Sequence, residues 1–495
     1  MLVDSLGALA SRSRRHDVCI IGSGPAGATI AHALGRAGLS VLLLEAGEES
    51  WSEASQAVYD GEFYGDPRLL PLSVSRLRQF GGSSNHWGGW CRPLDAIDFE
   101  TKIEEVDGAW PIGRADLEPW LEPARRILEL PGLPADVAFG DSLRHVAFGY
   151  SPPVNFATRY GEEFRRSDRI DLALGSYVTG FDVDGGQVVH ARVRDRDGAE
   201  RLVAARRFVL CAGGIENSRL LLWANRQTGG RLVPEPAALG RYWMEHPHFT
   251  LGHILLEDDF PFAFDARGTV FIAPTPETMR ERQILAFGLR VHPAKEGVAR
   301  ELITALACVA PGLSEKVFRR FRKRLVCGLL LRASWEQPPR PYNRVVLSDR
   351  VDAFGIPRTD LHWSLDEFDR RTPQVAAELL GAELAARGIG RIRLDPWVRG
   401  LEGFPADDEI GGNHHMGGTR MSRDPRRGVV DADCRVHGIG NLYVGGSSVF
   451  PSAGFANPTL TIVQLALRLA DHLARGLARD GEQHGLLRVE TGSAA

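Results

Sequence analysis

The segment at residues 17–47 constrains the fold of this chain more than any other segment does. It reads DVCIIGSGPAGATIAHALGRAGLSVLLLEAG. A short apolar run ends at Ile21, a glycine-rich turn and a run of small residues follow, and a second apolar run ends before Glu45. Apolar runs of this length on either side of a helical pattern predict buried parallel strands joined by a helix. We therefore expect an α/β fold.

Three glycines in this segment have the spacing of a dinucleotide site. Gly22 permits a tight turn, Gly24 lets a pyrophosphate approach the backbone, and Gly27 lets the helix pack closely on the strand. The helix N-terminus supplies free N–H groups for the phosphates. Glu45, at the end of the second strand, can accept hydrogen bonds from a ribose. The segment predicts a Rossmann-type domain, but it does not distinguish FAD from NAD.

A second glycine cluster, RQFGGSSNHWGGWCRP, occupies residues 78–93. It has neither helical nor strand periodicity. Its small residues and hydrogen-bonding side chains suit a loop that lies against a flat ring system. The alternative is a surface loop that carries buried tryptophans.

A third glycine-rich stretch, GGNHHMGGTRM at residues 411–421, contains two adjacent histidines. Glycines let a backbone approach a ligand closely, and histidine is the side chain most easily used as a base near neutral pH. Downstream, NLYVGG predicts a short strand, and NPTLTIVQLALRLADHL predicts a helix that starts after Pro458. A loop that precedes a helix is a suitable place for an active site.

These segments resemble the glucose–methanol–choline (GMC) oxidoreductases, which are FAD-dependent. The segments SNHW and GFANPTLTI are nearest to the pyranose oxidase-like sugar oxidoreductases of that family. The resemblance implies that FAD is the cofactor and that an alcohol (CH–OH) group is oxidised by hydride transfer to flavin N5 with a histidine base. It also implies that His86 lies where some members bond covalently to the flavin, although many relatives hold FAD without such a bond.

The same resemblance implies which residues contact the cofactor. Besides the three glycines and Glu45 of the first segment, these are Gly82, Ser83, Asn85, His86, Val178, Ala212, Gly446, Asn457, Pro458 and Thr459. No metal site is expected.

The family's C-terminal signature, which is similar to H-x-x-G-T-x-R-M, implies the position of the catalytic base. An alignment without gaps on Met421 places the base at His414 rather than at His415. The chain departs from the signature because Thr419 comes one place late. The second catalytic position is Asn457, which would orient the hydroxyl while a neutral His414 accepts its proton.

The remaining sequence predicts how the domains are arranged. Residues 206–224 are expected to form a strand and a helix that return to the FAD-binding domain, which is therefore discontinuous. Alternating apolar stretches such as HFTLGHILLEDDFPFAF and RVVLSDRVDAFGIPRTDLHWSL predict an antiparallel sheet backed by helices, which would form the substrate-binding domain. The expected divisions are residues 1–235 for FAD binding, with a flavin-contact segment at 76–150; residues 236–400 for substrate binding; residues 401–480 for the returning catalytic part; and residues 481–495 as a loose tail.

Charge and cysteine content argue against several other classes of protein. The formal net charge is -4, which gives no electrostatic reason to bind nucleic acid or an anionic membrane. Six cysteines occur singly, so a disulfide framework or a zinc site is not expected. No apolar stretch is long enough to span a bilayer, and the basic and then apolar segment 317–331 is expected to be a solvated helix face that runs into a buried strand. A cytoplasmic location fits best.

We therefore expect an FAD-dependent enzyme that oxidises a sugar, a glycoside or an amino sugar. The alternatives are a flavin-containing lyase, an enzyme that acts on a non-sugar alcohol, a non-catalytic flavoprotein and an NAD enzyme. The electron acceptor could be oxygen, a quinone or a redox partner, and a dehydrogenase is slightly favoured over an oxidase.

Overall fold

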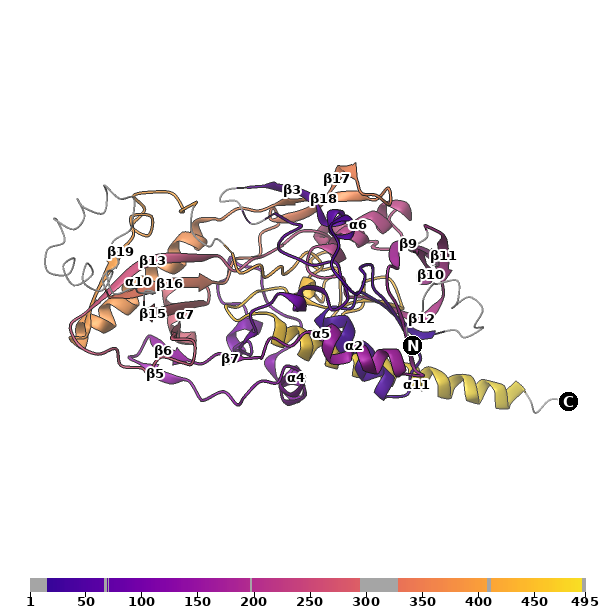
Figure 1. Cartoon of the computed structure of the whole chain (residues 1–495), viewed down its shortest axis with the longest axis horizontal. Coiled ribbons are helices and arrows are strands. Elements are labelled where there is room, and N and C mark those ends of the chain that lie inside the picture. Colours follow the sequence, from indigo (N-terminus) through magenta and orange to yellow (C-terminus); the bar gives the residue numbers. More distant parts are fainter. Residues whose placement is uncertain are drawn as a thin grey trace.

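A five-stranded parallel sheet organises one half of the molecule (Figure 1). The computed structural model describes residues 16–65, 69, 71–195, 198–293, 328–406 and 411–491, with side chains up to residue 480. The strand order is β20-β12-β1-β2-β8. These strands are β1 His16–Ile21, β2 Val41–Leu44, β8 Ile170–Ala173, β12 Ala205–Leu210 and β20 Leu442–Val444. The runs predicted from the glycine segment thus form the central strands β1 and β2, which are buried along nearly their whole length.

Helices accompany this sheet: α2 Pro25–Arg36, α5 Phe156–Arg166, α6 Glu216–Gln227 and α11 Thr459–Thr491. α2 starts directly after the glycine turn with Pro25 in its first turn, where a missing N–H has no intrahelical partner to lose. α11 starts after Pro458, as predicted, and packs against α2. Beside the sheet, the antiparallel strands β9 Tyr177–Asp184, β10 Gln187–Arg194 and β11 Glu200–Val203 form a separate three-stranded layer.

A seven-stranded antiparallel sheet forms the other end of the molecule (Figure 1). Its order is β19-β13-β16-β15-β14-β6-β5. These strands are β5 Val137–Phe139, β6 Leu143–Val146, β13 His248–Leu256, β14 Val270–Pro274, β15 Phe287–Pro293, β16 Leu329–Trp335 and β19 Gly390–Leu394. Helix α10, Glu367–Ala386, covers one face, where Phe249 and Trp335 are buried in a shared core. The prediction of an antiparallel sheet backed by a helix is confirmed.

One predicted pair of strands does not belong to the seven-stranded sheet. The stretch that starts at residue 344 forms β17 Arg344–Val351 and β18 Pro357–His362, which pair with each other and not with the seven-stranded sheet. β18 pairs in parallel with β3, Gly61–Tyr64. Assigning this stretch to the substrate sheet was therefore wrong, because alternation reports one buried face and not which sheet buries it.

The shorter elements are α3 Glu53–Gln56, α4 Leu121–Ile127, α7 Pro276–Arg282, β4 Trp90–Cys91 and β7 Gly149–Tyr150. Helix α11 continues to Thr491, so the expected loose tail is helical over residues 481–491. The segment predicted at 317–331 lies outside the described residues up to residue 327. No described helix is long and apolar enough to cross a membrane. The domain boundaries at residues 235, 400 and 480 stay predictions.

Candidate active site

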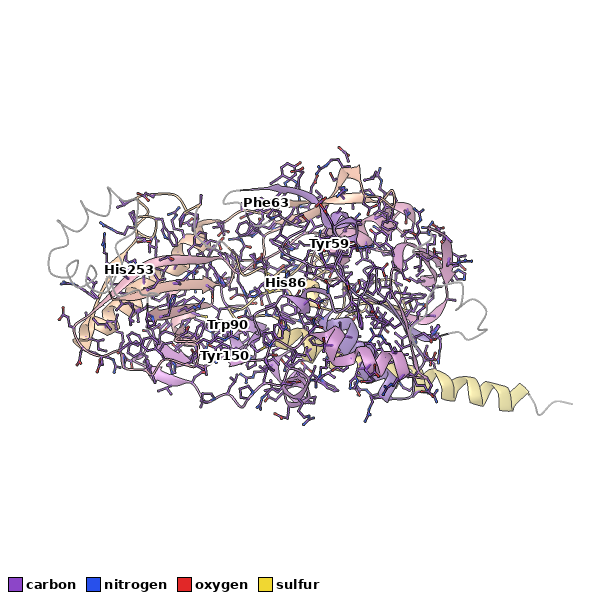
Figure 2. The ribbon with its side chains drawn as sticks, in the orientation of Figure 1. Tyr59, Phe63, His86, Trp90, Tyr150 and His253 are labelled. Atoms are coloured by element: carbon purple, nitrogen blue, oxygen red, sulfur yellow. The ribbon has the colours of Figure 1, made fainter. Side chains whose placement is uncertain are left out.

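A cavity of about 720 Å³ lies between the two large sheets. One side is lined by the glycine turn after β1, by Glu45 and by the segment from Ala212 to Glu216. The other side is lined by the seven-stranded sheet, through His248, Phe271 and Arg290 among others. In Figure 2, His86, Trp90 and Tyr150 lie in the middle of the molecule, where these two sides meet. A volume of this size is in the range of small-molecule and cofactor sites.

The turn between β1 and α2 has the geometry that a diphosphate requires. Gly22 has a φ of +101°, in the left-handed region that favours glycine. A Cβ at Gly27 would lie 1.9 Å from the carbonyl oxygen of Gly22, so this glycine permits close packing of helix on strand. A Cβ at Gly24 would meet nothing within 4 Å, so here the backbone borders open cavity. The turn therefore fits the role of a phosphate cradle at a helix N-terminus.

Glu45 is buried at the end of β2 and lines the cavity. Its Oε2 accepts hydrogen bonds from the backbone N–H and the hydroxyl of Ser23, at 3.0 and 2.6 Å. Its Oε1 accepts from the backbone N–H of Gly47 at 2.7 Å. These bonds fix the carboxylate and leave it lone pairs for the hydroxyl groups of a ribose.

The second glycine cluster lies against the first. A Cβ at Gly82 would lie 3.2 Å from the Cα of Gly24. Gly82, Ser83 and His86 line the cavity, and His86 is exposed into it; covalent bonding of flavin through His86 stays a prediction. Asn85 does not line the cavity, because its amide nitrogen donates to the carbonyl oxygens of Phe80 and Gly82. Asn85 braces the loop.

The other predicted cofactor contacts fall on the cavity wall. They are Val178, Ala212, Gly446, Asn457, Pro458 and Thr459. Gly27 is not on the wall, in keeping with its packing role.

His414 and Asn457 come together at the junction of the two sides. The amide nitrogen of Asn457 lies 3.0 Å from Nε2 of His414, and both residues line the cavity. Burial and the neighbouring His246, His248 and His415 lower the pKa of His414 well below its usual value. The His414 ring is therefore neutral at neutral pH and can act as a base.

His415 also lines the cavity but has different surroundings. Its ring packs against Trp243, with ring centroids 5.6 Å apart, and burial lowers its pKa to about 3. Its carbonyl oxygen accepts a hydrogen bond from the hydroxyl of Ser447 at 2.6 Å. Asn457 pairs with His414 and not with His415.

A buried carboxylate holds the His414 loop in place. Oε1 of Glu245 accepts the backbone N–H groups of His246 and His414 at 2.8 and 2.7 Å. The nearby backbone of Gly412 and Asn413 favours the charged carboxylate and lowers its pKa, and the N–H of Gly412 donates to the carbonyl oxygen of His246 at 3.1 Å. Burial nevertheless raises the pKa of Glu245 to about 7. Sequence reasoning missed Glu245, because a buried acid 169 positions away from His414 gives no local signal of this contact.

Two arginines on the seven-stranded sheet were also missed. Arg290 on β15 and Arg332 on β16 are cross-strand partners, and both line the cavity near His248. The guanidinium of Arg290 lies 4.8 Å from the centre of the Trp90 ring. The alternation of buried and partly exposed residues along β16 could have identified the face, but not what it faces.

Two family models match the chain. The model described as FAD dependent oxidoreductase matches residues 17–327. The model described as GMC oxidoreductase matches residues 339–466, which include both His414 and Asn457.

Similar curated proteins are oxidoreductases. The chain is 28% identical to 6'''-hydroxyparomomycin C oxidase of Streptomyces lividus, with 94% of this chain and 93% of that enzyme covered. It is 28% identical to a C-glycoside 3-oxidase of Microbacterium trichothecenolyticum, with 81% and 76% covered. A 28% match to the fructose dehydrogenase large subunit of Gluconobacter japonicus covers 57% of this chain and 50% of that subunit. The solved structure of pyridoxine 4-oxidase from Mesorbium loti shares the fold, with a TM-score of 0.57, 18% identity, and 92% and 99% of the two chains covered.

Proposed function

Because this chain belongs to the FAD-dependent oxidoreductases and carries the C-terminal domain of the GMC oxidoreductases, we propose that it oxidises an alcohol group of a sugar or glycoside to a carbonyl. The observation that carries the proposal is the 3.0 Å pairing of His414 with Asn457 on the wall of the cavity. In this proposal residues 1–235 and 401–480 hold the cofactor, and residues 236–400 hold the substrate.

Each residue of the pair has one task in this reaction. FAD, when bound, supplies the acceptor for the hydride that leaves the alcohol carbon. His414 accepts the hydroxyl proton at Nε2, so that the carbonyl bond can form. Asn457 hydrogen-bonds the same hydroxyl and orients it, and its amide does not titrate.

The sheet side of the cavity supports a polyhydroxylated substrate. Sugars, glycosides and aminoglycosides are named among the substrates of similar proteins. Arg290 and Arg332 present guanidinium groups, which donate hydrogen bonds to hydroxyl oxygens, and Phe271 offers an apolar surface.

An anaerobic experiment tests the proposal. The purified holoenzyme is mixed with sugars, glycosides, aminoglycosides and simple alcohols while the flavin absorbance is followed. Bleaching by a sugar or glycoside is the expected result. If no compound bleaches a flavin that dithionite can reduce, the sugar assignment is wrong, and a lyase becomes the better reading. Admitting air afterwards separates an oxidase, whose flavin recovers rapidly, from the slightly favoured dehydrogenase.

Two matched variants test the base. His414→Gln should lower the rate of flavin reduction by about 100- to 10,000-fold, because the general base is lost. His415→Gln should lower it much less, since its ring packs on Trp243. Both variants should keep FAD, which the absorbance spectrum of the purified proteins reports. Equal losses in the two variants would contradict the choice of His414.

A further inference from the structure

A second histidine lies behind His414, on the side away from Asn457. His246 lies two positions before the start of β13 and is fully buried. It is 168 positions away from His414 in the sequence. Its ring stands nearly perpendicular to that of His414, at 85°, with centroids 5.0 Å apart. The two Nδ1 atoms are 2.9 Å apart, a hydrogen-bond distance.

The hydrogen bond at Nε2 of His246 determines which of its two ring nitrogens carries the proton. Nε2 of His246 is 2.8 Å from the carbonyl oxygen of Gly454. A carbonyl oxygen only accepts, so Nε2 carries the hydrogen and donates it. Burial lowers the pKa of His246 to about 4, so the ring is neutral near pH 7 and its Nδ1 has only a lone pair.

The proton of His414 follows from that of His246. The 2.9 Å contact needs one N–H, and His246 has none at Nδ1, so Nδ1 of His414 must donate. A neutral His414 then has its lone pair at Nε2, which accepts from the amide nitrogen of Asn457 at 3.0 Å. The other tautomer of His414 would oppose two lone pairs across the Nδ1 contact. Rotating the Asn457 amide could not relieve that repulsion.

We propose that His246 is a positioning residue that holds His414 in the tautomer whose Nε2 carries the lone pair that can accept a proton. The consequence for catalysis rests on the proposed alcohol oxidation, but the tautomer itself does not. Glu245 completes the arrangement, because one of its oxygens accepts the backbone N–H groups of both histidines and so fixes their separation.

Other ionisable groups surround this pair. Glu245 contacts its backbone, and the His248 ring lies 6.2 Å from the His414 ring. His415 follows His414 in sequence and also lowers its pKa. The positive charges of Arg290 and Arg332 lower the pKa of His248. The Nδ1 contact with His246 is a direct hydrogen bond to the His414 ring, which a substitution at His246 can remove.

Two substitutions of nearly equal shape isolate the hydrogen bond. His246→Asn and His246→Leu both remove the imidazole and leave similar space, but only asparagine offers an oxygen near the position of Nδ1. We expect His246→Leu to lower kcat for flavin reduction by about 10- to 100-fold with little change in KM, because the unprotonated Nε2 is no longer enforced. His246→Asn should keep at least several times more of the rate. Equal rates in the two variants, or a loss confined to KM, would overturn the proposal.

A spectroscopic readout separates this inference from the proposed function. Nitrogen NMR of histidine-labelled holoenzyme distinguishes an Nδ1–H from an Nε2–H tautomer, and His414→Gln assigns the signal. The expected result is Nδ1–H in the native protein and in His246→Asn, with a shift towards Nε2–H in His246→Leu. An Nε2–H tautomer in the native protein refutes the role of His246 even if sugars reduce the flavin. An Nδ1–H tautomer in a protein that no alcohol reduces refutes the proposed function alone.

Discussion

At the scale of single residues, Gly24 and Gly27 are three positions apart and have opposite surroundings. Gly24 has an ordinary extended backbone, with φ at -66°, and borders the cavity. Gly27 lies inside α2 and faces the backbone of Gly22. One glycine therefore leaves room for a ligand, and the other leaves room for the protein itself.

Replacing each glycine with alanine should separate these two tasks. Gly24→Ala should keep the stability of the protein and weaken FAD binding, since its new methyl group occupies open cavity. Gly27→Ala should lower the free energy of unfolding by about 1–3 kcal/mol or more, because its methyl group would overlap a carbonyl oxygen. Denaturant unfolding of the FAD-free proteins and titration with FAD measure the two effects. A Gly24→Ala protein that is destabilised but binds FAD normally would contradict this assignment.

The sequence predicted residues that belong to a local motif, such as the glycine turn, or to a motif shared with a known family. Gly22, Glu45 and Asn457 all lie on the cavity wall, and the GMC resemblance and the FAD cofactor are confirmed by the family matches. Glu245 and His246 lie 168 or more positions before His414, and a motif contains no information about such distant contacts. The catalytic roles of His414 and Asn457 stay predictions.

At the scale of elements, the strands around the glycine turn were predictable because parallel strands buried on both faces are apolar throughout. The pairing of β18 with β3 was not predictable, because a parallel register between residues 61 and 359 leaves no local signal in the sequence.

The two halves of the molecule are also joined by a buried charge cluster that no sequence pattern indicated. In it, Lys102 lies 2.8 Å from Asp98 and 2.7 Å from Glu336, which follows β16.

Removing the cation of this cluster should destabilise the folded protein. Lys102→Met should lower the free energy of unfolding by about 3–5 kcal/mol, since two buried carboxylates lose their counter-ion. Burial raises the pKa of Asp98 to about 6 even with Lys102 present. Adding Glu336→Gln to Lys102→Met should recover part of the loss. Denaturant unfolding of both variants checks this, and a single variant as stable as the native protein would show that the cluster contributes little.

At the scale of the whole molecule, burial of the site makes stability depend on pH. Burial lowers the pKa of His246 to about 4 and of His248 and His415 to about 3, from 6.5. The unfolded chain binds these protons below pH 6.5 and the folded chain does not, so stability falls as pH falls from 6.5. Glu245 and Asp369, whose pKa values burial raises to about 7, and Asp98, whose pKa it raises to about 6, act in the opposite direction. The pKa of His414 is lowered as well, so four buried histidines oppose these three carboxylates.

The free energy of unfolding should therefore decrease as pH falls from 6.5 towards 4, and His246 alone should contribute roughly 3 kcal/mol of that change. His246→Asn should make the slope shallower by about one proton. Unfolding at several pH values in denaturant measures both slopes. A native protein whose stability does not change over this range would show that these histidines are not held neutral by the fold.

The parallel sheet is completed by β20, which adds to its edge beside β12 more than 400 residues after β1 has been made. Asn457 and the start of α11 come later still. At about 5–20 residues per second, a ribosome needs on the order of 20 to 80 s to make the residues between β1 and β20. Throughout that interval the nascent chain carries an open sheet edge and an incomplete flavin cradle. FAD can therefore stabilise the complete fold only after β20 and the start of α11 have been made.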